Sequence, residues 1–183
     1  YCVRSRAIHR DMYLQRPDLG RLLDERSAEQ LQQIDSPAAD ICIIVADGLS
    51  ATAITQNAIQ VVSGLVEKVQ QTGFSLAPIV LVEQGRVAIM DAIGSLLNAR
   101  LAIILIGERP GLSSFDSMGA YITYAPRPGL TDESRNCISN IREQGLAPVL
   151  AVDNIMDLIR SAFRFQLTGV QLKADSNADL LSA

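Results

Sequence analysis

The chain has 183 residues, of which 48% are hydrophobic but only 4% are aromatic, and it contains no Trp. This length suits a single domain whose core is built from aliphatic side chains. The formal net charge of −4 argues against a protein that binds nucleic acid by electrostatic attraction.

The cysteines and the apolar runs exclude further classes. Cys2, Cys42 and Cys137 show no C-x-x-C spacing, so we expect neither a disulfide framework nor a zinc site, and a reducing cytoplasmic compartment is favoured. No apolar run is long enough to cross a bilayer, so no membrane association is expected. The sequence opens on Tyr1 without a secretory signal, and because it does not begin with Met we expect a fragment or a processed product.

The first segment, residues 1–36, is charged and rich in Arg. Apolar side chains at helical spacing predict a helix here, with Pro17 in its first turn and Ser36-Pro37 marking its end. The side chains that make up this stripe are Leu19, Leu22, Leu23, Leu31 and Ile34.

Residues 37–172 carry the pattern of an α/β domain. Short runs of β-branched residues predict strands, and stretches with apolar residues on one face predict helices. The expected strands cover 41–45, 77–82, 101–106 and 121–124, and the expected helices cover 51–71, 87–97 and 148–167. Their alternation predicts a single Rossmann-like domain with a mostly parallel sheet flanked by helices, preceded by the helical first segment. Residues 173–183 are expected to form a flexible tail.

The sequence offers no self-contained catalytic constellation. Its one histidine, His9, lies in the charged first segment and is expected at the surface. A Ser/His/Asp triad, a Cys/His pair and a His-rich metal site all need His among the loops at strand ends. There is also no G-x-x-x-x-G-K-[ST] phosphate loop, and no G-x-G-x-x-G follows a strand. We therefore expect no catalytic residue and no metal ligand in this chain.

Polar residues follow three of the predicted strands. Asp47-Gly48 follows the first strand, Gln84 to Val87 follows the second, and Glu108-Arg109 follows the third. In a parallel sheet these loops lie at the same edge, where ligands bind. The stretch from Gly107 to Leu112 is the most informative, because it brings a carboxylate acceptor and a guanidinium donor together where Pro110 and Gly111 are expected to turn the chain.

Each of these loops also has a purely local interpretation. Asp47 would accept backbone N–H bonds in an Asx turn, and Gly85 would supply a positive φ. Glu108 and Arg109 would pair with each other or with neighbours. Cys137 would by itself be a buried structural thiol, although its polar neighbours favour a position nearer the surface than Cys42. Only the convergence of the three loops favours a ligand site.

The same segments occur, in this order, in a known family. They are Arg16 to Arg21, Asp47 to Ser50, Gly85 to Val87, Gly107 to Leu112, Tyr121-x-x-Tyr124-x-Pro126-Arg127 and Cys137 to Ile141. Through them the chain resembles the small (light) subunit of ethanolamine ammonia-lyase over roughly Val3 to Gly169. It departs from the family in lacking its poorly similar N-terminal region.

The resemblance implies an activity, a partner and a cofactor. Family members pair with a large subunit, a TIM barrel that holds ethanolamine, and adenosylcobalamin, a cobalt corrinoid, lies between the two. The holoenzyme is a carbon–nitrogen lyase that converts ethanolamine to acetaldehyde and ammonia by radical chemistry, so the isolated chain is expected to be inactive. The family's cofactor contacts fall on Val87, Glu108 and Cys137. The implied location is the cytoplasm, or the interior of a bacterial microcompartment.

The residue types suit this implied cofactor. The corrin rim carries neutral carboxamides, and an ionised Glu108 would accept their N–H groups in charge-assisted hydrogen bonds. Backbone groups around Val87 and Cys137 would complete the contact. The D-x-H-x-x-G motif of another cobalamin family is absent around His9, so we do not expect this chain to bind the cobalt.

Two other functions stay open from the sequence. The first is a stand-alone nucleotide- or phosphate-binding α/β enzyme that uses Asp47, although His, Lys and phosphate-loop residues are missing near the strand ends. The second is a structural assembly subunit without any ligand contact.

Overall fold

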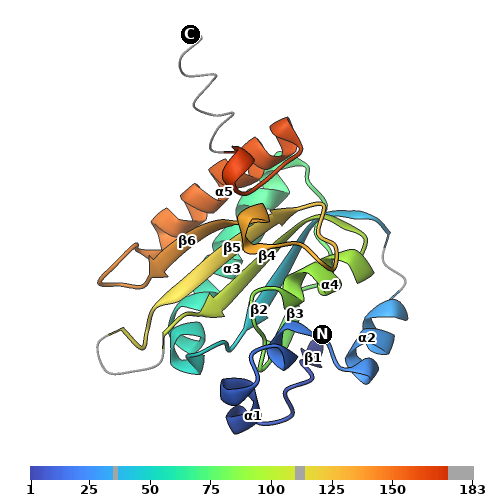
Figure 1. Cartoon of the computed structure of the whole chain (residues 1–183). Helices are drawn as coiled ribbons and strands as arrows, with labels where there is room; N and C mark the ends of the chain where they lie inside the picture. The colour runs from blue at the N-terminus through green and yellow to red at the C-terminus, as the bar shows by residue number, and fades with distance from the viewer. Residues whose placement is uncertain (35–36, 110–113, 173–183) are drawn as a thin grey trace.

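The computed structural model describes residues 1–34, 37–109 and 114–172. Within this part of the chain, six strands form one sheet in the order β1-β3-β2-β4-β5-β6 (Figure 1). The strands are β1 (Cys2–Arg4), β2 (Ala39–Ala46), β3 (Val80–Glu83), β4 (Ala99–Gly107), β5 (Met118–Tyr124) and β6 (Asn136–Ile141).

The α/β class is confirmed, but the sheet is only partly parallel. The neighbours β1–β3, β3–β2 and β2–β4 are parallel, whereas β4–β5 and β5–β6 are antiparallel. Parallel neighbours need a long crossover connection, while shorter connections return the chain in the opposite direction. No α-helix separates β4 from β5 or β5 from β6 in the described residues, so the prediction of a mostly parallel sheet was wrong for this half. The Rossmann-like topology is accordingly not confirmed.

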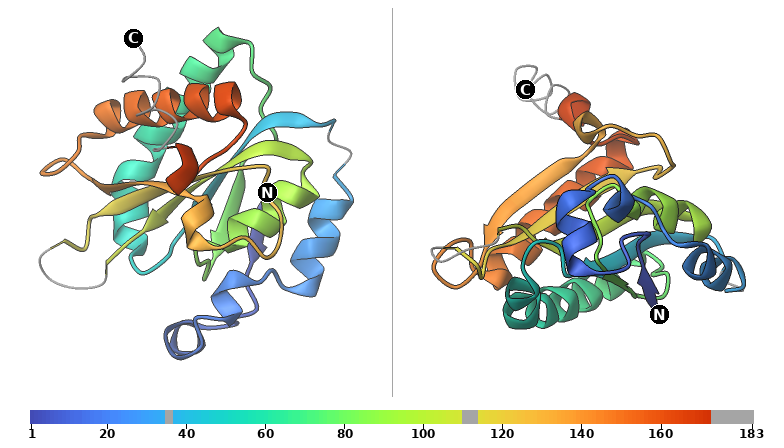
Figure 2. Two further views of the ribbon diagram at one scale, coloured as in Figure 1. Left: turned by 45° about the horizontal axis from the view of Figure 1, so that its top comes forward. Right: turned by 60° about the horizontal axis from the view of Figure 1, so that its bottom comes forward.

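Two layers of helices cover the sheet (Figure 2). One face packs against α3 (Ala51–Thr72) and α5 (Pro148–Phe165), and the other packs against α2 (Glu25–Gln32) and α4 (Ile89–Leu96). The predicted helices 51–71, 87–97 and 148–167 are thus confirmed to within a few residues. The predicted cap of α3 is also confirmed, because the Ser50 hydroxyl accepts a hydrogen bond from the Ala53 N–H at 3.3 Å and Gly73 ends the helix with a φ of 79°.

The first segment is not a simple helix. It begins with β1, continues through α1 (Arg10–Gln15) and a 3-10 turn (Leu19–Arg21), and reaches α2 only at Glu25. Pro17 lies in the turn after α1 and not in a first helical turn. The strand β1 is only three residues long, too short to show a periodic pattern, and it is held by parallel pairing with β3 and by burial of Val3.

Some predictions fall on residues outside the described ranges: the end signal at Ser36, the turn at Pro110-Gly111 and the tail 173–183. The predicted boundaries 1–36, 37–172 and 173–183 therefore remain predictions. Across the described residues, no helix combines the length and the apolar character needed to cross a membrane.

Candidate functional site

The ends of β2, β3 and β4 lie side by side, as predicted from their parallel direction. The first loop is tied to the second through Asp47, whose Oδ1 accepts the Gly48 N–H at 2.9 Å and the Gly85 N–H at 3.4 Å. The first loop is connected to the third loop because the backbone N–H of Leu49 donates a hydrogen bond to the Gly107 carbonyl oxygen at 2.8 Å. Asp47 therefore accepts hydrogen bonds from the backbone of the first two loops. Burial raises the pKa of its carboxyl.

Gly107 allows this close approach. A Cβ at this position would lie 2.1 Å from the carbonyl oxygen of Ser50 and 2.7 Å from that of Asp47. Both are backbone atoms, which cannot rotate away as a side chain can. In the second loop the residue with positive φ is Gln84, at 56°, and not Gly85 as the local interpretation expected. Gly85 is required by space instead, since its Cβ would lie 2.9 Å from Val82 Cγ1.

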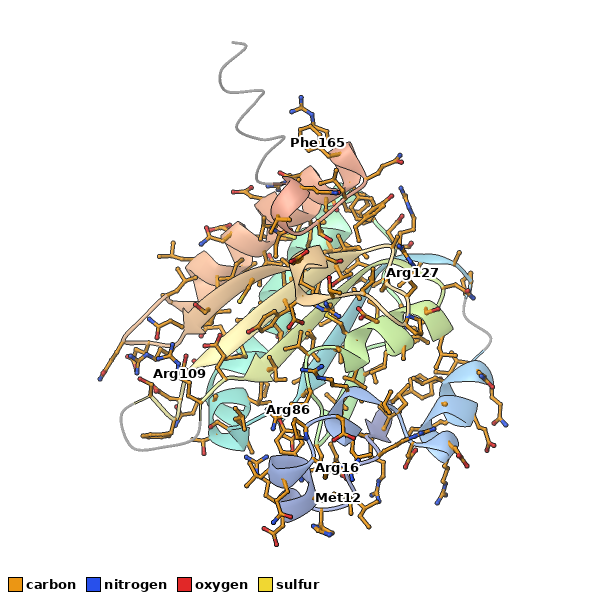
Figure 3. The ribbon with its side chains drawn as sticks, viewed as in Figure 1. Met12, Arg16, Arg86, Arg109, Arg127 and Phe165 are labelled. Atoms are coloured by element: carbon orange, nitrogen blue, oxygen red, sulfur yellow. The ribbon has the colours of Figure 1, made fainter. Side chains whose placement is uncertain are left out.

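A cavity of about 360 Å³ opens where the three loops meet. We call it the strand-end cavity. Two of the three residues predicted as cofactor contacts, Val87 and Glu108, line it. Its lining comprises Tyr13, Leu49, Arg86, Val87, Ile106, Gly107, Glu108, Arg109 and Tyr121. Figure 3 shows Arg86 and Arg109 at the end of the sheet nearest α1, while Arg127 lies at the opposite end.

Residues of the first segment contact Arg86 and hold it in place. The guanidinium carbon of Arg86 lies 4.2 Å from the centre of the Tyr13 ring. The backbone N–H of Arg86 donates a hydrogen bond to the Gly20 carbonyl oxygen at 2.7 Å. The Tyr13 hydroxyl in turn donates to the Gly85 carbonyl at 3.2 Å. Gly20 must be small, because a Cβ there would meet Arg86 Cγ at 2.7 Å. The Arg16 to Arg21 motif thus fixes the cavity wall through Gly20.

The fork of Arg10 clamps the first loop. Its Nη1 and Nη2 donate to the carbonyl oxygens of Gly48 and Leu49 at 2.7 and 2.9 Å, and its guanidinium also lies against the Tyr13 ring. Arg86 Nε is buried and without a hydrogen-bond partner among the described atoms. A buried donor without a partner is costly to keep, and Arg86 Nε is one of four such side-chain atoms among the described residues, with Gln84 Oε1, Asp91 Oδ1 and Arg135 Nε.

Glu108 is half-buried at the end of β4 and already has two partners. Its Oε2 accepts from the Ser117 hydroxyl at 2.9 Å and from the Asn140 N–H at 3.2 Å. A Cβ on Gly119 would lie only 2.4 Å from Glu108 Oε1, so that glycine makes room for the carboxylate. Among the described residues no ion pair joins Glu108 to the exposed Arg109, contrary to one local interpretation.

Val87 lines the strand-end cavity, whereas Cys137 is not among its lining residues. Val87 is half-buried in the turn before α4. Cys137 is exposed on β6, opposite Tyr121 of β5, and Tyr121 lines the cavity. Cys42 is fully buried, and burial raises the pKa of its thiol to about 12. The prediction that Cys137 lies nearer the surface than Cys42 is confirmed, and the idea of a buried structural thiol at 137 is wrong.

Two further predictions concern the position of His9 and metal binding. His9 is exposed, as predicted, and its Nδ1 accepts the Met12 N–H at 3.2 Å as the N-cap of α1. Within residues 1–34, 37–109 and 114–172, no group of three or more His, Cys, Asp and Glu side chains could hold a metal ion.

A second cavity of about 360 Å³ lies on the other face of the sheet, between α3 and β3. It is lined by Val45, Ile54, Thr55, Ala58, Ile59, Val62, Ser63, Ile79 and Leu81, which carry no ionisable group. The strand-end cavity is the better candidate, since it joins an apolar wall to several convergent polar groups.

Several lining residues were not predicted as cofactor contacts, among them Tyr13, Arg86 and Tyr121. The last two belong to segments that the resemblance uses, Gly85 to Val87 and Tyr121-x-x-Tyr124, so their motifs carried a usable signal. Tyr13 gave no such signal, because it reaches the cavity from a helix that was not predicted at that position.

Comparison with known proteins identifies a family for this chain. Residues 1–173 match the family model described as "Ethanolamine ammonia-lyase light chain (EutC)". Curated relatives named "Ethanolamine ammonia-lyase small subunit" include proteins from Ralstonia nicotianae, 53% identical over 186 residues, and Azotobacter vinelandii, 52% identical over 177 residues. A relative of the same name from Pseudomonas putida is 50% identical over 184 residues.

These alignments take in almost all of the chain but not all of the relatives. They cover 99%, 95% and 99% of the chain, and 68%, 66% and 68% of the three relatives. The chain thus spans about two thirds of the length of the curated relatives it matches.

Proposed function

The chain belongs to the ethanolamine ammonia-lyase light chain family, and we propose that it acts as the small subunit of that lyase, covering adenosylcobalamin against a large subunit. The observation that carries the proposal is the strand-end cavity, which brings Val87 and Glu108 together and borders Cys137 through Tyr121. The holoenzyme would convert ethanolamine to acetaldehyde and ammonia.

The chemistry of the cavity fits the rim of a corrin. Carboxamides need both acceptors and donors, and the lining offers the Glu108 carboxylate beside the guanidinium groups of Arg86 and Arg109. The unpaired Arg86 Nε would gain a partner from a ligand carbonyl if the side chain shifts slightly. Val87 and Leu49 supply apolar contact.

The cavity is far too small to enclose a whole corrin. This supports contact with one edge of the cofactor only, so the rest must be covered by another protein surface. A large subunit would supply that surface, and hence the cofactor would lie between the two chains.

The division of roles follows from the residue types. When bound, adenosylcobalamin supplies the radical chemistry of the reaction. The lining of the strand-end cavity contains no histidine, and the described residues include no cluster that could hold a metal ion, so the part of this chain is to bind and orient the cofactor and to exclude water. Glu108 would accept amide N–H groups, while Val87 and Cys137 would shape the contact surface.

The two other functions are less well supported. The stand-alone enzyme needs a free Asp47, but the Oδ1 of this carboxyl already accepts two backbone N–H groups. The relatives named above also give no support to that function. A purely structural subunit would not account for the convergence of charged and polar side chains in the lining of the strand-end cavity.

The direct test is to express the chain with an ethanolamine ammonia-lyase large subunit and purify through a tag on this chain. We expect the large subunit to be recovered and the complex to produce acetaldehyde from ethanolamine with adenosylcobalamin. The chain alone should produce none. Turnover by the chain alone, or failure of the large subunit to bind, would reject the proposal. The cytoplasm and the interior of a microcompartment both remain compatible locations.

A further inference from the structure

Tyr121 lies between Cys137 and the other two residues that are proposed to contact the cofactor, Val87 and Glu108. Its side chain lines the strand-end cavity together with Val87 and Glu108. On β5 it stands directly opposite Cys137 of β6. Directly opposed residues of antiparallel strands point to the same face and touch through their side chains. Tyr121 therefore joins Cys137 to the other two positions.

The pairing of β5 with β6 places the Tyr121 side chain beside that of Cys137, whose thiol contributes to the electrostatic environment of the Tyr121 hydroxyl. Burial, the charge and the hydrogen bond of Cys137, and the charge of Glu108 together raise the pKa of Tyr121 above its ordinary value. The hydroxyl therefore keeps its proton at neutral pH and remains a hydrogen-bond donor. Sulfur is a weak acceptor, which suits this donor.

We propose that Tyr121 is a positioning residue that holds the Cys137 sulfur at the rim of the strand-end cavity. This inference rests on the proposed function. Cys137 is exposed on β6, the strand at the edge of the described sheet, and an exposed side chain can sample several χ1 rotamers. A fixed sulfur avoids the entropy cost of ordering that side chain when a ligand binds.

The test uses the complex of this chain with the large subunit and measures the dissociation constant of adenosylcobalamin by absorbance titration. Tyr121→Phe removes only the hydroxyl, and we expect it to raise the dissociation constant about 3- to 10-fold, as for one side chain that must be newly ordered. Tyr124→Phe is the matched control. It lies on the same strand, three positions away and thus on the opposite face, where its hydroxyl meets Arg100 and not Cys137. The control should change the constant less than about 2-fold.

Two substitutions at Cys137 show whether Tyr121 acts through the sulfur. In a Cys137→Ala background the acceptor is gone, so Tyr121→Phe should have no further effect on the dissociation constant. In a Cys137→Ser background an acceptor remains, and the effect of Tyr121→Phe should persist. The same loss in both backgrounds would overturn the positioning role, as would an unchanged constant in the single variant.

The outcomes separate this inference from the proposed function. If the wild-type complex does not bind adenosylcobalamin, the proposed function fails and the role of Tyr121 falls with it. If the wild-type complex binds and Tyr121→Phe binds equally well, only the role of Tyr121 is wrong. If the Tyr121→Phe variant does not assemble with the large subunit, Cys137→Ser and Cys137→Ala are compared instead. Equal dissociation constants of adenosylcobalamin for these two variants would overturn the inference.

Discussion

Arg135 and Asp91 form an ion pair in which both side chains are almost completely removed from solvent, at 2% and 3% exposed. Asp91 lies in the first turn of α4, four residues after Val87, and Arg135 lies two residues before Cys137. The pair therefore joins the helix that follows Val87 to the residue that directly precedes the strand carrying Cys137. Arg135 is further held by the carbonyl oxygens of Thr131 and Leu130.

Removing one partner of this pair should be strongly destabilising. Asp91→Ala would leave the buried Arg135 guanidinium without its buried carboxylate and with the exposed Asp132, 3.6 Å from Nη1, as its remaining ion pair among the described residues. We expect a loss of about 3–5 kcal/mol in the free energy of unfolding. Urea unfolding of the purified chain measures this loss. Arg160→Ala, which breaks the exposed pair with Asp157, should cost less than about 1 kcal/mol. Equal effects of the two substitutions would contradict the buried pair.

The pH dependence of stability tests the environment of Asp91. Burial raises the pKa of its carboxyl from 3.8 to about 6, although Arg135 acts in the opposite direction. Between these two values the folded chain binds a proton that the unfolded chain has released. The contribution of Asp91 to stability is therefore largest below the unfolded pKa and is lost as the pH rises through the folded one.

Asp91→Asn provides the reference for this measurement, because its amide does not titrate. The difference in unfolding free energy, wild type minus variant, should fall as the pH rises from about 4 to about 6 and then level off. A difference that rises over the same range would show that the attraction of Arg135 outweighs burial.

Glu108→Ala should weaken cofactor binding in the complex. We expect a loss of about 1.5–3 kcal/mol, the size of a charge-assisted hydrogen bond. Because the carboxylate also accepts from Ser117 and Asn140, the chain should lose about 1–2 kcal/mol of stability while keeping its fold. The affinity comes from cofactor titration and the stability from urea unfolding.

Glu83→Ala is the control for Glu108, since Glu83 is exposed and pairs with Arg4. It should leave the cofactor affinity unchanged. If Glu108→Ala loses stability but binds the cofactor as well as the wild type does, Glu108 is a structural residue only.

The three cysteines should differ in their rates of reaction with a thiol reagent. Cys2 and Cys137 are exposed and should react rapidly, whereas the buried Cys42 should react only on unfolding. Adding the large subunit and cobalamin should slow Cys137 sharply relative to its rate in the free chain. Mass spectrometry of the labelled peptides measures each rate. A Cys137 that reacts as slowly as Cys42 in the free chain would remove it from the site.

The sequence predicted what depends on local patterns. The aliphatic runs of β2 and β4 and the stripe of α3 were recognisable because burial demands continuous or periodic apolar residues. The strand ends could likewise be placed together, since parallel strands end at one edge of a sheet. Ser50 and Gly73 marked the ends of α3 through their capping chemistry.

What depends on distant partners could not be predicted in this way. The β1 strand exists because β3 pairs with it, and β6, with the polar sequence Asn136 to Asn140, exists because β5 does. Because β6 was not predicted, the sequence did not indicate that Cys137 and Tyr121 are neighbours. The stacking of Arg86 on Tyr13 is also a tertiary contact, between residues 73 positions apart.

Cofactor binding by separate and combined subunits shows whether this chain forms part of the adenosylcobalamin site. Adenosylcobalamin is titrated into this chain, into the large subunit, and into an equimolar mixture of the two, and the dissociation constant is measured in each case. We predict weak binding to this chain alone and tighter binding to the mixture than to either subunit. A mixture that binds the cofactor no more tightly than the large subunit alone would contradict this prediction.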